Sequence, residues 1–281
     1  ESCKFLEKIG YKITYLEVNK YGEINLNKFK NLINKNTFLV SLMSVNNEIG
    51  TIHPIKRIGE ICKKEKIFFH TDASQALGKI EFDANYLNVD SASFSSHKIY
   101  GPQGIGVLFI KKRKDIRLIP LLSGGGQENG LRAGTLNTAG IVAMRCALEL
   151  STSEQETEAL RLSELRNELY AQLTSNIPNL LLNGPALDNV RHRLSNNLNI
   201  CFGDVDGEAL MMSTPDLAIS SGSACSSTNP EPSHVLLAIG RSDDETRASL
   251  RFGLGRFTTP ADVDAAAQLL TKSIQRLRAL R

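Results

Sequence analysis

The sequence predicts an α/β fold, with a large domain built on a mostly parallel sheet and a smaller α+β domain after it. In the first half of the chain, short apolar runs alternate with helical patterns. In the second half, long helical patterns surround a few short strand-like runs. Strand–helix–strand alternation is typical of a parallel sheet covered by helices. A helix-start pattern at residues 151–154 sets the boundary, so we expect domains at residues 1–152 and 153–281.

The large domain opens with a helix-like pattern and continues with four expected strands. These strands are expected at residues 38–43, 67–71, 89–94 and 107–110, with a helix at 55–64. Polar groups follow three of the strands closely, at 46–48, 72–75 and 95–98. Because ligands of open α/β sheets bind beyond the carboxyl ends of the strands, we expect these groups to share one crevice.

A glycine-rich loop at residues 124–130 and a helical pattern at 138–150 end the large domain. In the smaller domain, apolar runs predict strands near 198–202, 217–219 and 248–252. Helical patterns there cover residues 154–174, 207–212, 233–239 and 260–280. Pro260 stands near the first turn of the last helix, where proline is tolerated.

The composition of the chain indicates which classes of protein and partner it fits. A hydrophobic share of 41% with 22% charged residues is ordinary for a globular chain, and a net charge of +3 does not favour nucleic acid. No apolar run reaches the roughly 20 residues that span a membrane, so no membrane partner is expected. The five cysteines are an odd number without metal-ligand spacing, which favours a reducing compartment and no intrinsic metal. We therefore expect a cytoplasmic protein, with an organellar one as the alternative.

Lys98 lies between a serine-rich turn and a glycine, directly after an apolar run. A desolvated lysine loses its charge and becomes a nucleophile that forms Schiff bases with aldehydes such as pyridoxal phosphate. His97 can stack on a flat cofactor or transfer protons, and the neighbouring hydroxyls can hold a phosphate. The simpler interpretation is an exposed lysine in a polar loop.

Asp72 and Gln75 have the chemistry to bind the ring of such a cofactor. A carboxylate at the end of the strand 67–71 can pair with a pyridinium nitrogen, which keeps the ring electron-withdrawing. Gln75 can donate to the phenolic oxygen. Asp72 equally suits a helix cap, and Gln75 an ordinary position on a first turn.

Cys225 and Arg251 are the candidates in the second half. Cys225 lies in a small, polar stretch from Ser220 to Pro230, where an exposed thiol can act as a nucleophile or belong to a linker. Arg251 lies on an expected strand, where its guanidinium suits the capture of an amino-acid carboxylate or a surface ion pair. The other histidines, His53, His70, His192 and His234, lack metal-ligand spacing and are interpreted as structural.

Seven segments together resemble the cysteine desulfurases. They are Ser-Val-Asn-Asn-Glu-Ile-Gly-Thr (44–51), His-Thr-Asp-Ala-Ser-Gln (70–75), Ser-Phe-Ser-Ser-His-Lys-Ile-Tyr-Gly-Pro-Gln-Gly-Ile-Gly (93–106), Gly-Gly-Gly-Gln-Glu (124–128), Arg-Ala-Gly-Thr (132–135), Ser-Ser-Gly-Ser-Ala-Cys-Ser (220–226) and Arg-Phe-Gly-Leu-Gly-Arg-Phe-Thr (251–258). The resemblance keeps the order of the family and covers nearly the whole chain. The long stretch around Cys225 resembles the branch that feeds iron–sulfur cluster assembly.

This resemblance implies a pyridoxal-phosphate enzyme of the fold-type I transferase class that works as a homodimer. Lys98 would hold the aldehyde of the cofactor. The other implied cofactor contacts are Asp72 on the ring nitrogen, Gln75 and Asn47 at the phenolic oxygen, Ser95 and His97 on the phosphate, and Thr135 on the phosphate in the partner subunit. Asn47 and Arg251 would bind the substrate carboxylate.

The implied reaction converts L-cysteine to L-alanine and leaves a persulfide on Cys225. Lys98 would move the α-proton, and a scaffold or other acceptor protein would then take the sulfur by exchange. Although no intrinsic metal is expected, Cys225 would be able to ligate a cluster transiently together with such a scaffold.

The family carries an earlier segment with a phosphate-binding threonine and a histidine that stacks on the ring, and Glu1 stands just after that region. We therefore expect an N-terminally truncated large domain that binds the cofactor poorly or not at all when expressed alone. Two alternatives remain. One is a related lyase or aminotransferase, for example one that acts on selenocysteine, and the other is an inactive fragment that dimerises or binds a scaffold.

Overall fold

The computed structural model describes residues 2–113, 115–221 and 232–280. The chain forms two compact units, which are described separately. Unit 1 comprises Glu1–Thr37, Asn46–His53 and Glu158–Arg281, and unit 2 comprises Phe38–Val45 and Pro54–Thr157. Each unit combines separate stretches of the chain, whereas the sequence predicts one boundary between residues 152 and 153. That boundary stays a prediction.

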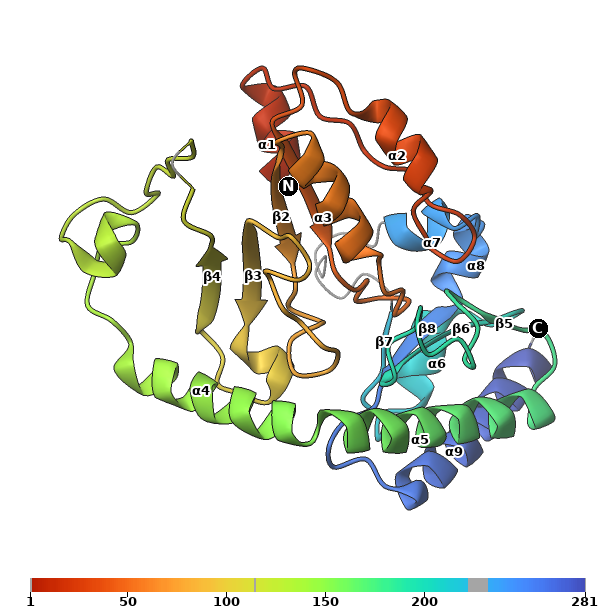
Figure 1. Ribbon diagram of the computed structural model, residues 1–281. Helices are drawn as coiled ribbons and strands as arrows, with labels where there is room; N and C mark the ends of the chain where they lie inside the picture. Colours follow the sequence, from red (N-terminus) through yellow and green to blue (C-terminus); the bar gives the residue numbers. More distant parts are fainter. Residues whose placement is uncertain (1, 114, 222–231, 281) are drawn as a thin grey trace. The chain divides into compact units, whose positions relative to one another are not determined.

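Unit 2 contains a four-stranded sheet in the order β1-β2-β3-β4 (Figure 1). The strands are β1 (Leu39–Met43), β2 (Phe68–Asp72), β3 (Ser91–Ser95) and β4 (Gly106–Ile110). β1, β2 and β3 are parallel, and β4 is antiparallel to β3. The mostly parallel sheet is therefore confirmed.

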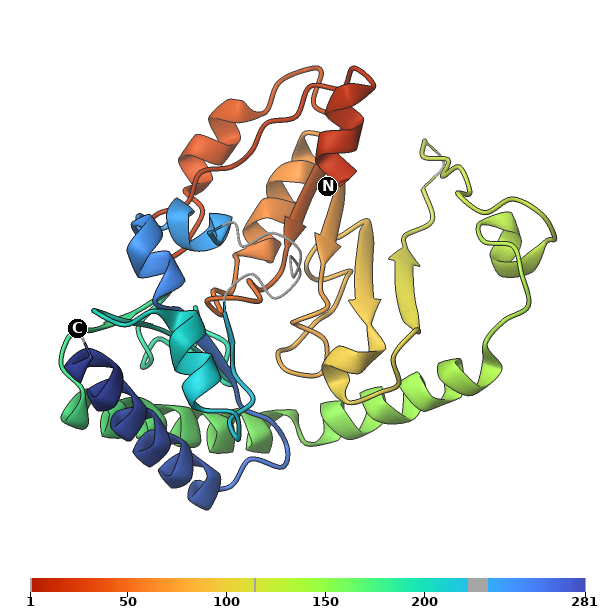
Figure 2. The same ribbon diagram turned by 180° about the vertical axis from the view of Figure 1, so that it is seen from behind.

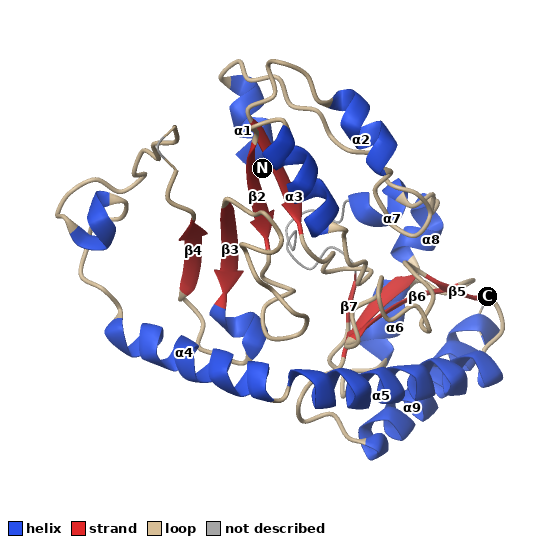
Figure 3. Cartoon of the chain, viewed as in Figure 1, coloured by secondary structure: helices blue, strands red, loops and turns tan. Residues whose placement is uncertain are grey.

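Helix α3 (Ile55–Lys64) packs against β2 of this sheet (Figure 3). It buries Ile55, Ile58 and Cys62, which recur at the three- and four-residue spacing of one helix face. The sequence predicts this helix with the same bounds. The unit also contains two short 3-10 helices, η1 (Ser96–Ile99) and η2 (Gln127–Gly130), and α4 (Thr138–Ser153), which lies against η1.

Unit 1 contains a second four-stranded sheet, which is antiparallel and has the order β5-β6-β8-β7. Its strands are β5 (Leu180–Leu182), β6 (Asn197–Phe202), β7 (Ser220–Ser221) and β8 (Ser249–Gly253). Every residue of β6 is buried. Leu198, Ile200 and Phe202 share the main core of the unit with residues of α5 (Gln155–Asn176) and α9 (Pro260–Ala279), which lie side by side in Figures 1 and 2.

The shorter helices of unit 1 begin at side chains that cap them. Asn25 caps α2 (Leu26–Leu32), Asp206 caps α6 (Gly207–Ser213) and Ser233 caps α7 (His234–Ala238). Capping boxes start α8 (Asp243–Arg247) and α9. The unit also includes α1 (Ser2–Lys8), which buries none of its residues.

The strand expected at 217–219 is wrong in position. β7 lies at Ser220–Ser221, where it pairs with β8, and Leu217 and Ile219 instead pack against the core of unit 1. In this segment the apolar residues show where the chain packs against the core and not where it pairs as a strand. The sequence also did not predict α2, β5 and α8, which are short elements of seven residues or fewer. Within the described ranges, no helix is long and apolar enough to cross a membrane.

Candidate functional site

The predicted residues of unit 2 follow the carboxyl ends of two neighbouring parallel strands. Asp72 is the last residue of β2 and stands opposite Ser93 of β3 in the register. β3 ends two residues later at Ser95, and η1, with His97 and Lys98, begins at the next residue. The sheet therefore brings Asp72 and the turn that carries Lys98 to one edge. Residues 46–48, which the sequence places in the same crevice, belong to unit 1, so the shared crevice stays a prediction.

Asp72 is exposed, and one of its carboxylate oxygens has a local role. Oδ1 accepts a hydrogen bond of 2.9 Å from the backbone N–H of Ser74, which stabilises the turn after β2. The next element after β2 is β3, so Asp72 stabilises a turn here and does not cap a helix. A carboxylate has two oxygens, so this contact does not prevent Asp72 from pairing with a ring nitrogen.

Gln75 bonds to a lysine that the sequence analysis did not single out. Lys79 Nζ donates to Gln75 Oε1 at 2.9 Å, and both side chains are half-buried. Burial, together with the positive charge of Lys98, lowers the pKa of Lys79 to about 8. No sequence signal points to Lys79, because the segment from Gln75 to Lys79 forms turns, and the folded chain brings the two side chains together.

The turn around Lys98 is tightly built. Ser95 Oγ lies 2.9 Å from His97 Nδ1. Tyr100 ends the turn in the left-handed region with φ 66°, and a Cβ on Gly101 would come within 2.1 Å of Ser96 Oγ. Only glycine fits there, so the Gly101 backbone can pack against the turn that presents His97 and Lys98, which are both exposed.

These residues fit pyridoxal phosphate by their chemistry. An exposed amine can bind the aldehyde, a carboxylate oxygen can meet the ring nitrogen, and a hydroxyl and an imidazole in contact with each other can hold phosphate. The Ser96 hydroxyl in the same turn is buried and has no hydrogen-bond partner among the described residues. The polar turn and the two strand ends are thus suited to a phosphorylated aldehyde.

Asn47 and Arg251 come together in unit 1. Arg251 lies on β8, and its Nη1 donates to the backbone oxygen of Asn47 at 3.0 Å. The cross-strand neighbours of Arg251 are Asn199 on β6 and Ser220 on β7. The guanidinium therefore keeps further donors for a carboxylate beyond the one that Asn47 receives.

Glu48, the residue after Asn47, is a buried carboxylate that the sequence analysis did not assign. Its Oε2 accepts a hydrogen bond of 2.5 Å from Ser233 Oγ, and its backbone oxygen accepts from the side chains of Asn197 and Asn199. Burial raises the pKa of Glu48, and the Ser233 bond and the charges of His234 and Arg251 oppose that rise. This network holds the turn that carries Asn47.

Two predicted residues lie outside these groups. Cys225 falls outside the described residues; the described residues on either side include Ser220–Ser221, paired with β8, and Ser233, bonded to Glu48. Thr135 is exposed in unit 2, on the segment between η2 and α4.

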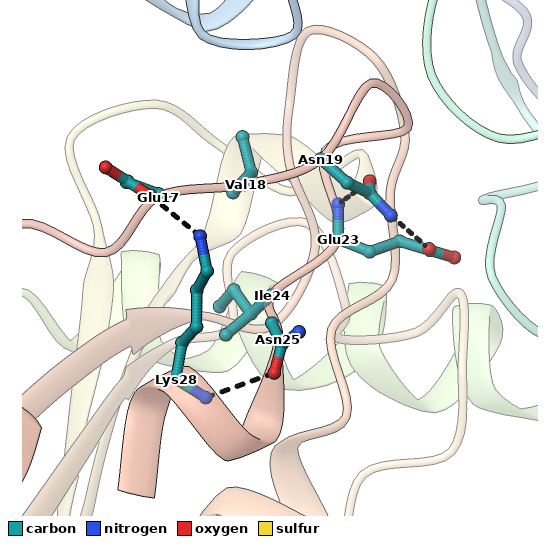
Figure 4. Close-up of a pocket in the computed structure, with 7 residues that line it drawn as sticks. All are labelled: Glu17, Val18, Asn19, Glu23, Ile24, Asn25 and Lys28. Atoms are coloured by element: carbon teal, nitrogen blue, oxygen red, sulfur yellow. Dashed lines mark hydrogen bonds and ion pairs between the residues drawn. The ribbon is translucent and has the colours of Figure 1, made fainter. Parts of the chain in front are cut away.

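A pocket near the start of α2 is a separate place in unit 1 (Figure 4). Its carboxylates already have partners, because Glu17 pairs with Lys28 at 3.1 Å and Glu23 contacts Asn19 and His192. It holds none of the predicted residues. In the part of the chain that the structure describes, no group of three or more His, Cys, Asp and Glu side chains could hold a metal ion.

The aminotransferase class-V family matches residues 2–266 of the chain. The mitosomal cysteine desulfurase of Trachipleistophora hominis is 45% identical over 278 residues, which are 99% of this chain and 63% of that protein. The probable mitochondrial cysteine desulfurase of Dictyostelium discoideum is 46% identical, with 99% and 61% covered. The cysteine desulfurase IscS of Rickettsia typhi is 46% identical, with 99% and 67% covered. The chain thus spans about three fifths to two thirds of these relatives.

Two solved structures are also similar to this chain. A NifS-like protein superposes with a TM-score of 0.88 at 33% identity, covering 98% of this chain and 72% of that one. SspA in complex with cysteine superposes with a TM-score of 0.74 at 36% identity, covering 92% and 70%.

Proposed function

Because the chain belongs to the aminotransferase class-V family, we propose that it is the greater part of a cysteine desulfurase that depends on pyridoxal phosphate. Such an enzyme converts L-cysteine to L-alanine and supplies the sulfur for iron–sulfur cluster assembly. The observation that carries this proposal is the match to cysteine desulfurases over 99% of the chain. The NifS-like structures confirm the predicted fold class, and the family match confirms the predicted resemblance.

Lys98, Asp72 and Gln75 would hold the reactive part of the cofactor, with Ser95 and His97 on its phosphate. When bound, pyridoxal phosphate supplies an electron-withdrawing ring that takes up electron pairs from breaking bonds of the substrate. Asp72 favours the protonated ring by its negative charge, and its position at the end of β2, opposite Ser93, supports this role. Lys98 would move the α-proton once its amine is free; because the side chain is exposed in this structure, the desolvation that the sequence analysis invoked is not present here.

Arg251 would orient the substrate through its carboxylate. Its bond to the Asn47 backbone oxygen fixes the guanidinium on β8 and leaves other N–H donors for a bidentate contact. The similar SspA structure contains cysteine, which supports an amino acid of this size as the substrate. Cys225 would then attack the substrate sulfur, so that a new S–S bond forms while the carbon–sulfur bond breaks and alanine is left.

Dimerisation would place Thr135 at the cofactor of a partner subunit. The support in this chain is an apolar stretch in the segment between β4 and η2, where Ile119 and Leu121 are 85% and 99% exposed. Large apolar side chains at such exposure are suited to an interface with a second copy. The sulfur acceptor and the cytoplasmic location stay predictions, since the relatives include mitosomal, mitochondrial and bacterial proteins.

The proposal is tested by supplying the chain with pyridoxal phosphate and then with L-cysteine. After borohydride reduction, mass spectrometry should find the cofactor attached at Lys98, and Lys98→Ala should remove the attachment. Cys225→Ser should keep the attachment but abolish the formation of alanine and sulfide. A chain that makes a keto acid from cysteine and is indifferent to Cys225→Ser would be an aminotransferase instead.

A further inference from the structure

Lys79 lies in the run of turns that follows β2 of unit 2. Gly78, the residue before Lys79, has a left-handed backbone with φ 69°, so this segment is a series of hydrogen-bonded turns and not a helix. The turns place Lys79 beside Gln75. This placement brings the ammonium group of Lys79 to the amide of Gln75 at 2.9 Å.

The contact decides how the Gln75 amide is turned. A lysine ammonium can only donate hydrogen bonds, so the atom it meets is the amide oxygen. A glutamine amide has one oxygen and one NH₂ group on opposite sides of the same carbon. With Oε1 held by Lys79, the NH₂ group points the other way and offers two donors.

Lys79 is held in place at an electrostatic cost. Its side chain is half-buried, and burial together with the positive charge of Lys98 lowers its pKa to about 8. Among the described residues, its hydrogen-bond partner is the neutral Gln75 amide and not a carboxylate. A half-buried lysine without a carboxylate partner is more costly than an exposed one, so a surface role does not account for it.

We propose that Lys79 is a positioning residue that fixes the Gln75 amide so that its NH₂ group donates to the phenolic oxygen of pyridoxal phosphate. This inference rests on the proposed function, because it takes the cofactor as the acceptor. The orientation serves an anionic oxygen, since the reversed amide would present its own oxygen and repel the phenolic oxygen. Lys79 acts through Gln75 and does not itself touch the cofactor.

The test compares Lys79→Met with a matched control, Lys63→Met. Lys63 also donates to a side-chain amide oxygen of unit 2, that of Asn88 at 3.1 Å, but it lies on α3. The first measurement is the NMR signal of the Gln75 side-chain NH₂ in chain labelled with ¹⁵N-glutamine, assigned by its loss in Gln75→Glu. Lys79→Met should shift this signal, and Lys63→Met should leave it in place.

The second measurement is the affinity for pyridoxal phosphate, followed by its absorbance. Lys79→Met and Gln75→Ala should each weaken binding about tenfold, and the double variant should be no weaker than Gln75→Ala alone, since both remove the same bond. An unmoved Gln75 signal or additive losses of affinity would overturn the role of Lys79. A chain that does not bind the cofactor at all leaves the match to the cysteine desulfurases standing but shows that this chain alone does not load the cofactor, and the NMR measurement then decides the role of Lys79 separately.

Discussion

In unit 1 the candidate residues, exposed Asn47 and half-buried Arg251, rest on a network of buried polar neighbours, whereas unit 2 presents its candidate residues at strand ends and in turns. Around Asn47 and Arg251, Glu48, Asn197 and Asn199 are buried and hydrogen-bonded to one another or to backbone. In unit 2, Asp72, His97 and Lys98 are exposed. The comparison indicates that the substrate-binding candidates are preorganised by the fold, while the cofactor-binding candidates are positioned by strand register and short turns.

The largest expected effect that would test this comparison is the loss of Arg193 in unit 1. Arg193 is 2% exposed and donates to the backbone oxygens of Asn183, Pro185 and Asn197. Arg193→Met would leave these acceptors buried without their donor and should lower the free energy of unfolding by about 3 kcal/mol. Urea unfolding measures this, and Arg57→Met, at an exposed position on α3 of unit 2, should change it by less than about 0.5 kcal/mol.

The stability of the chain at acid pH is a second test of the comparison between the two units. His53 of unit 1 is 8% exposed, and burial lowers its pKa to about 4, against a weaker opposing effect of Glu23. Between pH 6.5 and 4 the unfolded chain binds a proton at His53 and the folded chain does not, so stability falls as the pH falls through this window. The loss should approach roughly 3 kcal/mol at pH 4.

His53→Gln should remove most of this acid dependence, as followed by unfolding curves at several pH values. His192→Gln is the matched control, because the His192 side chain is half exposed and pairs with the same Glu23. Equal pH profiles for the native chain and His53→Gln would show that the burial of His53 does not govern the acid stability of unit 1.

In unit 2 we expect a smaller change in the free energy of unfolding, and we expect it at alkaline pH. The pKa of Lys79 is about 8, so between pH 8 and 10.5 the unfolded chain binds a proton at this residue that the folded chain lacks. Stability should therefore rise with pH in this window, by about 1–2 kcal/mol after allowance for the partial exposure of Lys79. Cys62 acts in the opposite direction above pH 9, because burial raises the pKa of its thiol to about 12.

The effect of Lys79 is isolated by comparing the native chain with Lys79→Met over pH 8–10.5. The variant should keep the decline caused by Cys62 and lose the rise. If the free energy of unfolding changed with pH in the same way in both proteins, the burial of Lys79 would carry no electrostatic cost.

The sequence predicts more of unit 2 than of unit 1, for a physical reason. Strands and helices of a parallel sheet are long apolar or amphipathic runs, so β2 and α3 are visible in the sequence. β5 and β7 have three and two residues, too few to show a period, and β7 consists of serines. Their place is decided by pairing with β6 and β8, which sequence patterns do not show.

The same reason separates the predicted from the missed site residues. Asp72 ends a strand, and Gln75 and Lys98 lie three residues beyond strand ends, where a local pattern points to them. Glu48 bonds to Ser233, which is 185 residues away, and only the folded chain brings them together. Lys79 was missed because turns, and not a helix, bring it to Gln75, and a single lysine on a turn is a common feature.

The smallest expected effect concerns the buried carboxylate of Glu48. Burial raises the pKa of Glu48, so the folded chain keeps a proton there at pH values where the unfolded chain has lost it. Stability should therefore decline as the pH rises above about 4.5, the ordinary pKa of a glutamate. Glu48→Gln removes the charge and keeps an oxygen that accepts from Ser233, so it should be neutral or stabilising by up to about 1 kcal/mol at pH 7.

Glu48→Ala is the matched comparison, because it removes the oxygen as well and leaves the Ser233 hydroxyl buried without its partner. It should destabilise the chain by about 1–3 kcal/mol in urea unfolding at the same pH. A Glu48→Gln variant as unstable as Glu48→Ala would mean that the charge itself, through His234 and Arg251, holds this network together. Unit 1 would then be organised by ion pairing rather than by neutral hydrogen bonds, and the contrast with unit 2 would be one of charge rather than of burial.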